Sequence, residues 1–161
     1  MKYLTLLCLS IVCFGADIDV RFSPDGGCTK LIVQSIEKAK NTLHIQTYQL
    51  TSEPITDAII EAAKRGVTVH IILDKSNVGN RNSRKDSLSL AGIQVKIDRQ
   101  HSINHNKVIV IDSQVVITGS FNFSKNAERS NAENCIAIHD PQVALQFIEN
   151  YNLHEKHSDD Q

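Results

Sequence analysis

The segment from Val67 to Leu73 restricts the fold of this chain more than any other feature, because it is apolar at nearly every position. A strand that is apolar on both faces requires a sheet with helices packed on each side. The flanking sequence fits this arrangement, since segments with the two-residue period of strands alternate with segments of helical period. We therefore expect an α/β sandwich, with a mixed β-sheet flanked by helices.

The expected elements follow one another without an internal repeat or linker, so residues 17–161 are expected to form one domain. Pro54 stands early in the second helix, where its missing N–H is harmless, and Gly66 ends that helix. The expected strands are 17–22, 43–50, 67–73, 93–98, 107–112, 114–118 and 135–139. The expected helices are 31–39, 52–65, 83–91 and 141–155.

Residues 1–16 differ in composition from the rest of the chain. Lys2 precedes an apolar run from Leu4 to Phe14, and two small residues end the segment. This is the pattern of a secretory signal peptide, so we expect an exported protein that is periplasmic, membrane-associated or secreted. Two alternatives stay open. The first is an uncleaved membrane anchor, although the segment is shorter than the roughly 20 residues of a spanning helix. The second is a buried first strand or helix of the domain.

Two of the four cysteines, Cys8 and Cys13, lie in this N-terminal segment. Cys28 and Cys135 remain in the domain, and two cysteines in an exported protein are compatible with one disulfide. Two separate buried thiols are an equally good interpretation, because the sequence separation says nothing about proximity. We assign neither residue a catalytic role.

The net charge of −1 at pH 7 hides an uneven distribution. Residues 71–130 hold nine lysines and arginines against five acidic residues, whereas residues 131–161 hold one against six. A local basic surface attracts phosphate groups, so the middle of the chain is a candidate nucleic-acid interface. A solvated face without a partner explains the same charges equally well.

The polar loop at 75–85 is the part of this basic region that best fits such an interface. Lys75 and Arg81 lie in it among several asparagines, and these side chains can follow a phosphate backbone. Lys125 is a third candidate for phosphate contact. The alternative is an ordinary surface loop.

The residues with the clearest chemical potential lie between positions 105 and 122. His105 and Lys107 are one residue apart, so in a strand their side chains point to the same face. An imidazole beside a fixed positive charge suits attack on phosphorus and stabilisation of the negative charge that develops. Ser120 and Asn122 repeat this spacing and can aim a hydroxyl and an amide at the same anion.

With Asp112 and Gly119, these residues form the pattern H-x-K-x4-D-x6-G-S-x-N. The stretch closely resembles the phospholipase D superfamily. Glu133 resembles the acidic position that hydrogen-bonds the catalytic histidine in that family. Most members carry the motif twice, whereas this chain carries it once. In this respect it is similar to the small exported bacterial endonucleases of the superfamily.

The resemblance implies a mechanism with two histidines, and therefore a homodimer with one composite site. His105 of one subunit would form a phosphohistidine, while the second copy protonates the leaving alcohol and then activates water. Non-bridging oxygens would be held by Lys107, Ser120 and Asn122. Glu133 would orient the imidazole, and Asp112 would order the end of the strand. No metal or cofactor enters this scheme.

We therefore expect a metal-independent, sequence-nonspecific endonuclease that acts on DNA, with RNA activity open. Phe121 and Phe123 beside the motif would favour single-stranded DNA if they stack on bases, although both fit a core equally well. A lipid phosphodiesterase is the first alternative. A catalytically weak nucleic-acid-binding module for DNA uptake is the second.

The remaining histidines are interpreted as structural. His101 precedes His105 by four residues, a metal-binding spacing only on a helix, and this segment leads into a strand, so no metal is expected there. Two further histidines, His154 and His157, stand in the acidic tail and are expected to face solvent. His44 and His70 are expected in the core or on a sheet face.

Overall fold

The computed structural model describes residues 15–160 of the chain. The expected signal or anchor segment, with Cys8 and Cys13, lies almost wholly outside these residues. Among the helices at positions 15–160, none combines the length and the apolar character needed to cross a membrane.

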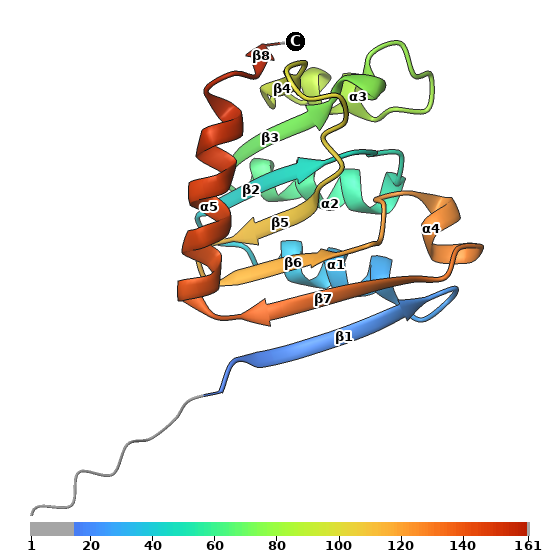
Figure 1. Cartoon of the computed structure of the whole chain (residues 1–161), viewed down its shortest axis with the longest axis vertical. Coiled ribbons are helices and arrows are strands. Elements are labelled where there is room, and N and C mark those ends of the chain that lie inside the picture. Colours follow the sequence, from blue (N-terminus) through green and yellow to red (C-terminus); the bar gives the residue numbers. More distant parts are fainter. Residues whose placement is uncertain (1–14, 161) are drawn as a thin grey trace, which may run out of the picture.

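One eight-stranded sheet forms the centre of the fold, in the order β1-β7-β6-β5-β2-β3-β4-β8 (Figure 1). The pairs β2–β3 and β3–β4 are parallel, and the other pairs are antiparallel. The strands are β1 (Asp17–Ser23), β2 (Thr42–Thr47), β3 (Thr68–Asp74), β4 (Val95–Asp98), β5 (Lys107–Ile111), β6 (Val115–Gly119), β7 (Glu133–His139) and β8 (Asp159–Asp160). The predicted mixed sheet is confirmed.

Helices cover both faces of this sheet. Figure 1 shows α5 running across one face, while α1 and α2 lie against the other. The helical elements are α1 (Cys28–Glu37), α2 (Glu53–Lys64), the 3₁₀ turn η1 (Lys75–Asn77), α3 (Lys85–Leu90), α4 (Lys125–Arg129) and α5 (Pro141–Glu155). The expectation of a sheet flanked by helices is therefore confirmed.

Strand alternation divides the apolar side chains between two cores. In β5, Ile109 and Ile111 pack in the large core with α1 and α2, whereas Val108 and Val110 pack under α5. The same alternation makes β3 apolar on both faces, since Ile71 and Ile72 are both buried. Burial on both faces explains why the sequence is apolar at nearly every position from 67 to 73.

The β5–β6 hairpin is fastened to the start of β2 by one carboxylate. Asp112 has a φ of 52°, and its side chain accepts hydrogen bonds from the backbone N–H groups of Lys40 (2.9 Å), Asn41 (2.7 Å) and Thr42 (2.9 Å). Burial acts to raise the pKa of Asp112, but these backbone hydrogen bonds outweigh it and hold the pKa below its ordinary value. Asp112 follows β5, so it lies at the opposite end of that strand from His105.

The cysteines of the domain are both free and buried. Although far apart in sequence, Cys28 and Cys135 lie within hydrogen-bonding range of each other. Burial raises the pKa of Cys28 to about 11 and raises the pKa of Cys135 further. Of the two interpretations, the structure therefore has two buried thiols in place of a disulfide. Their raised pKa values keep both thiols protonated at neutral pH.

The C-terminal histidines depart from the expectation of solvent exposure. The side chains of His154 and His157 are only 16% and 25% exposed. They pack with His101 around the fully buried carboxylate of Asp98. The prediction was wrong because α5 carries its last turn back to β4, a contact that local composition does not indicate. His44 and His70 stack on each other with ring centroids 4.6 Å apart, as residues of neighbouring strands.

Candidate active site

The motif residues meet at one end of three neighbouring strands, because these strands alternate in direction. β5 begins at Lys107, β6 ends at Gly119, and β7 begins at Glu133. The antiparallel pairs β5–β6 and β6–β7 place these three ends beside one another. The expected motif residues are thus gathered on one side of the fold, except Asp112.

His105 and Lys107 differ sharply in exposure. His105 is exposed in the loop just before β5, whereas Lys107 is only 5% exposed at the first position of the strand. The Lys107 ammonium donates a hydrogen bond of 2.6 Å to the carbonyl oxygen of His105. Burial lowers the pKa of Lys107, and the negative charge of Glu133 partly opposes this shift. A buried ammonium is therefore fixed beside an accessible imidazole.

Tyr48 joins these two residues, and sequence reasoning missed it. Its ring centroid lies 5.0 Å from that of His105 and 5.3 Å from the Lys107 ammonium nitrogen. The Tyr48 N–H donates to the Asn106 carbonyl oxygen at 2.9 Å, which continues the β2–β5 pairing beyond Thr47 and Lys107. Only that register brings Tyr48 to the site, so no local pattern signals it.

Buried polar contacts hold the loop that carries His105. The Asn104 N–H donates to the Asp74 carboxylate at 2.7 Å, and the Asn104 side-chain oxygen accepts from Gln46 (3.2 Å) and Asn106 (2.9 Å). Asp74 and Asn104 are each 2% exposed. Because the residues on both sides of His105 are fixed, the imidazole projects from a rigid segment.

Gly119 allows the end of β6 to lie close to the start of β7. Its φ is 140°, and a Cβ there would collide with the carbonyl oxygen of Asn134. That oxygen accepts the N–H groups of Ser120 (3.1 Å) and Phe121 (3.2 Å). The Ser120 hydroxyl oxygen accepts the Asn134 N–H at 3.0 Å, so its O–H is what remains for a substrate.

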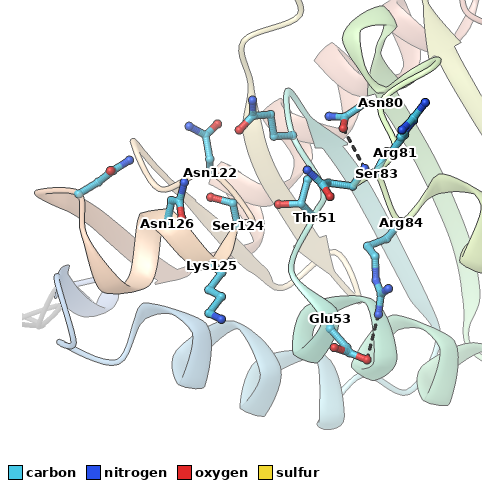
Figure 2. A pocket seen from close by; sticks show the side chains of 13 residues that line it. Thr51, Glu53, Asn80, Arg81, Ser83, Arg84, Asn122, Ser124, Lys125 and Asn126 are labelled. Atoms are coloured by element: carbon cyan, nitrogen blue, oxygen red, sulfur yellow. Dashed lines mark hydrogen bonds and ion pairs between the residues drawn. The ribbon is translucent and has the colours of Figure 1, made fainter.

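Asn122 faces a polar cavity of about 620 Å³ (Figure 2). Its side-chain oxygen is buried without a hydrogen-bond partner among residues 15–160. Arg81 and Lys125, which the sequence predicts to contact phosphate, also line this cavity, and both are exposed. The other lining residues include Gln49, Thr51, Glu53, Asn80, Arg84, Ser124 and Asn126. His105 and Lys107 lie outside the lining, so Asn122 is the motif residue that opens on this cavity.

The loop at 75–85 is in part a structural element. Asn77 is 1% exposed, and its amide donates to the carbonyl oxygens of Tyr48 (2.8 Å) and Asp74 (3.0 Å). Its side-chain oxygen accepts the Ser83 hydroxyl at 3.0 Å. The expectation that asparagines of this loop follow a phosphate backbone is therefore wrong for Asn77, because its side-chain amide is buried and forms hydrogen bonds within the protein.

Two basic side chains near this cavity are already engaged. Lys75 donates to the His101 carbonyl oxygen at 2.9 Å and does not line the cavity. Arg84 pairs with Glu53 at 3.2 Å. The positive charge at the cavity thus comes mainly from Arg81 and Lys125.

Glu133 is half-buried at the start of β7, where its carboxylate accepts a hydrogen bond of 3.1 Å from Asn131. It acts on Lys107 through its charge. Within the described part of the chain it makes no hydrogen bond to His105. Its role as the acceptor that orients the imidazole therefore stays a prediction.

Comparison with known proteins places this chain in a family. A family model described as "Cardiolipin synthase, PLD-like domain" matches residues 32–154. A protein named phospholipase D from Rickettsia prowazekii (strain Madrid E) is 46% identical over 136 residues, which cover 84% of this chain and 66% of that protein. The chain thus spans slightly less than two thirds of the length of that relative.

Two solved structures share the fold over nearly their whole length. Nuc from Salmonella typhimurium, described as a phospholipase D family member, has a TM-score of 0.87 and 33% identity, and the match covers 91% of this chain and 99% of that chain. NucT from Helicobacter pylori has a TM-score of 0.83 and 25% identity, with coverages of 89% and 98%. By its sequence, its fold and its motif, this chain belongs to the phospholipase D superfamily.

Proposed function

We propose that this chain is a phosphodiesterase that hydrolyses DNA without sequence specificity, and without a metal ion at the reacting phosphate. The observation that carries the proposal is the exposed His105 imidazole beside the buried, fixed ammonium of Lys107. A nucleophile next to a desolvated cation favours attack on phosphorus, since the cation stabilises the charge that develops there.

The reaction takes place in two displacements. The His105 imidazole attacks phosphorus, a P–N bond forms, and the P–O bond to the leaving alcohol breaks with its electron pair on oxygen. A second imidazole donates the proton that the alcohol needs, then takes a proton from water as the water oxygen attacks phosphorus and releases His105. Lys107, Asn122 and the Ser120 O–H stabilise the non-bridging oxygens.

The second imidazole belongs to another copy of the chain in this proposal. One chain offers a single His–Lys pair of the motif, so a two-fold dimer would bring His105 and the partner subunit's His105 to one phosphate. The exposure of His105 supports this arrangement. At the same end of the strands, Phe22 is the residue before the last position of β1; it is 64% exposed and offers apolar surface to a second copy.

DNA is the favoured substrate because Arg81 and Lys125 extend positive charge from Asn122 along the cavity in Figure 2. The expected preference for single strands loses its basis. Phe121 and Phe123 are each 1% exposed and belong to the core, so they are unavailable for stacking on bases. Single-stranded and double-stranded DNA are therefore equally supported substrates in this proposal, and RNA is a further substrate to compare.

A lipid phosphodiesterase is the second candidate. Ile103 is 57% exposed two residues before His105, where an apolar side chain could contact a membrane surface. The relative from Rickettsia prowazekii is also named phospholipase D. Export, through residues 1–16 as a cleaved signal or a retained anchor, is part of either proposal and is tested by sequencing the N-terminus of the fractionated protein.

The deciding experiment measures cleavage of single-stranded DNA, duplex DNA and phosphatidylcholine vesicles in excess EDTA. His105→Ala should lose more than about 10⁴-fold in rate, because it removes nucleophile and acid together. His139→Ala, at an exposed histidine at the far end of β7, is the matched control and should keep the full rate. Residual activity of a few per cent in His105→Ala would contradict the assigned role. Hydrolysis of the lipid alone would select the second candidate.

A further inference from the structure

Four potential metal-binding side chains meet where the last turn of α5 approaches β4. Asp98 ends β4, His101 follows in the loop toward β5, His154 lies in the last turn of α5, and His157 comes just after it. One ligand atom from each lies within 4.8 Å of all the others. Figure 1 shows the C-terminal end of α5 and β8 next to β4, which explains how distant segments converge here.

The Asp98 carboxylate is the centre of this cluster. Its Oδ2 lies 2.9 Å from Nδ1 of His101 and 3.3 Å from Nδ1 of His154, and its Oδ1 lies 3.8 Å from Nε2 of His157. Asp98 is fully buried, and its Oδ1 also accepts the backbone N–H groups of Gln100 (3.1 Å) and His101 (3.3 Å). The carboxylate is therefore held in one orientation by the backbone.

Hydrogen bonds within the cluster do not satisfy all of its polar atoms. Nε2 of His157 is shielded from solvent and has no hydrogen-bond partner in the described part of the chain. A buried ring nitrogen without a partner is costly, and a bound cation would satisfy it. Three basic side chains of neighbouring segments are engaged elsewhere, since Lys96 pairs with Glu155 (3.5 Å), Arg99 pairs with Asp159 (3.9 Å), and Lys75 donates to the His101 carbonyl oxygen (2.9 Å).

We propose that Asp98, His101, His154 and His157 bind one divalent transition-metal ion, with Zn²⁺ the best fit. Three imidazole nitrogens and one carboxylate oxygen form a donor set that zinc accepts in tetrahedral geometry, with bonds of roughly 2.0–2.2 Å. Ligand atoms already within 4.8 Å of one another need only small side-chain rotations to surround the ion. The three histidines, which are half-buried, have room for these rotations.

The proposed ion would be structural. Four protein ligands complete a tetrahedron and leave no position for a reacting water. The ion would fasten the end of α5 to the loop that follows β4, and three residues after His101 that loop is anchored by Asn104 to Asp74. It would thus help to hold the segment that presents His105, without taking part in the reaction there.

The test uses the full chain, stripped with a chelator and dialysed, and measures binding of Zn²⁺ by calorimetry. We expect one ion per chain, a higher unfolding temperature with the metal, and visible absorption bands of tetrahedral Co²⁺ when Co²⁺ replaces Zn²⁺. His157→Ala and His154→Ala should each weaken binding about 100-fold or more. His139→Ala, at an exposed histidine outside the cluster, should bind as the unmodified chain does.

Circular dichroism of each metal-free variant separates loss of the site from loss of the fold. His157→Ala removes a partly exposed side chain without a hydrogen bond, so its metal-free spectrum should match that of the unmodified chain. His154→Gln serves as the second variant if that spectrum changes. Absence of stoichiometric binding, or equal affinity in the histidine variants and the unmodified chain, would overturn the proposal.

Discussion

Lys107 affects the site through its surroundings as much as through its charge. Its burial lowers its pKa, and the opposing field of Glu133 helps to keep the ammonium charged. The ammonium contacts the Tyr48 ring and the His105 carbonyl oxygen at the same time. At the residue scale, the proposed catalytic pair is therefore a group of three, because the Tyr48 ring contacts both His105 and Lys107.

Tyr48→Ala should reduce kcat about 5- to 30-fold, the range that corresponds to a cation–π contact of about 1–2 kcal/mol. KM should change little, because the ring positions His105 and Lys107 and does not bind DNA in this account. Tyr48→Phe keeps the ring and should retain most of the rate. Steady-state kinetics on DNA checks this, and an equal loss in both variants would contradict a role for the ring.

Asp112 gives a prediction for stability instead of catalysis. Asp112→Asn should lower the free energy of unfolding at pH 7 by roughly 1–3 kcal/mol, since a charged acceptor of three backbone N–H groups becomes neutral. The lowered pKa means that this stabilisation is present above the pKa of the unfolded carboxyl and is lost as pH falls through the folded value.

Urea unfolding at pH 7 and at successively lower pH measures the difference between Asp112→Asn and the unmodified chain. That difference should shrink as the solution becomes acidic. Asp57→Asn, at an exposed position of α2, is the control and should change stability little. A difference that grows toward low pH would contradict the role assigned to Asp112.

The spacing of the motif predicted His105, Lys107, Gly119 and Asn122 as a group, and the strand ends place them on one side of the fold. Tyr48 could not be predicted in the same way. Its position depends on the pairing of β2 with β5, and such a register between distant segments has no local signature.

At the scale of elements, the strongest local signals gave the most accurate boundaries. The helix expected at 52–65 is α2 (Glu53–Lys64), with Pro54 in its first turn, and the helix expected at 141–155 is α5. Short elements were missed. α4 has five residues and begins where the Ser124 hydroxyl oxygen accepts the Ala127 N–H, and β8 has only two residues.

The strand expected at 43–50 also ends earlier, at Thr47. Beyond it the chain leaves the β3 pairing, and Leu50 instead makes a single bridge with Phe123. This departure brings Gln49 and Thr51 to the cavity of Figure 2. Contact with a distant residue therefore overrides the local strand pattern.

The loop after η1 and the helix α4 supply the charges that we assign to DNA binding. Replacing Arg81 and Lys125 together by Gln should weaken binding and reduce the slope of log K against log salt by about two, one for each phosphate that is no longer neutralised. Lys30→Gln, at an exposed position of α1, should leave the slope unchanged. Fluorescence anisotropy at several salt concentrations measures it, and an unchanged slope in the double variant would contradict the assignment.

At the scale of the whole molecule, sheet order decides which distant residues become neighbours. It brings α5 to β4, and so assembles Asp98 with three histidines that the sequence interprets as unrelated. It also places β1 at the edge of the sheet beside β7, with its apolar side chains exposed. Neither arrangement could be predicted from the sequence, because both depend on which strands pair.

A composite site predicts how activity falls when inactive subunits are mixed in. With equal amounts of unmodified and His105→Ala chains, unfolded and refolded together, only dimers of two unmodified subunits should cleave DNA. If the chains associate at random, about one quarter of the dimers have two unmodified subunits. Activity should then be about one quarter of that of the same total amount of unmodified chain. About one half is the expectation for chains that act independently, and that value would contradict a shared site.

The central claim, that His105 forms a bond to phosphorus, is tested most directly by trapping the intermediate. A labelled DNA oligonucleotide is incubated with the chain in EDTA, quenched in alkaline detergent, and the protein is analysed by electrophoresis and peptide mass spectrometry. We predict a covalent protein–oligonucleotide adduct that maps to His105 and is absent from His105→Ala. An adduct on another residue, or cleavage by His105→Ala at the unmodified rate, would contradict the account.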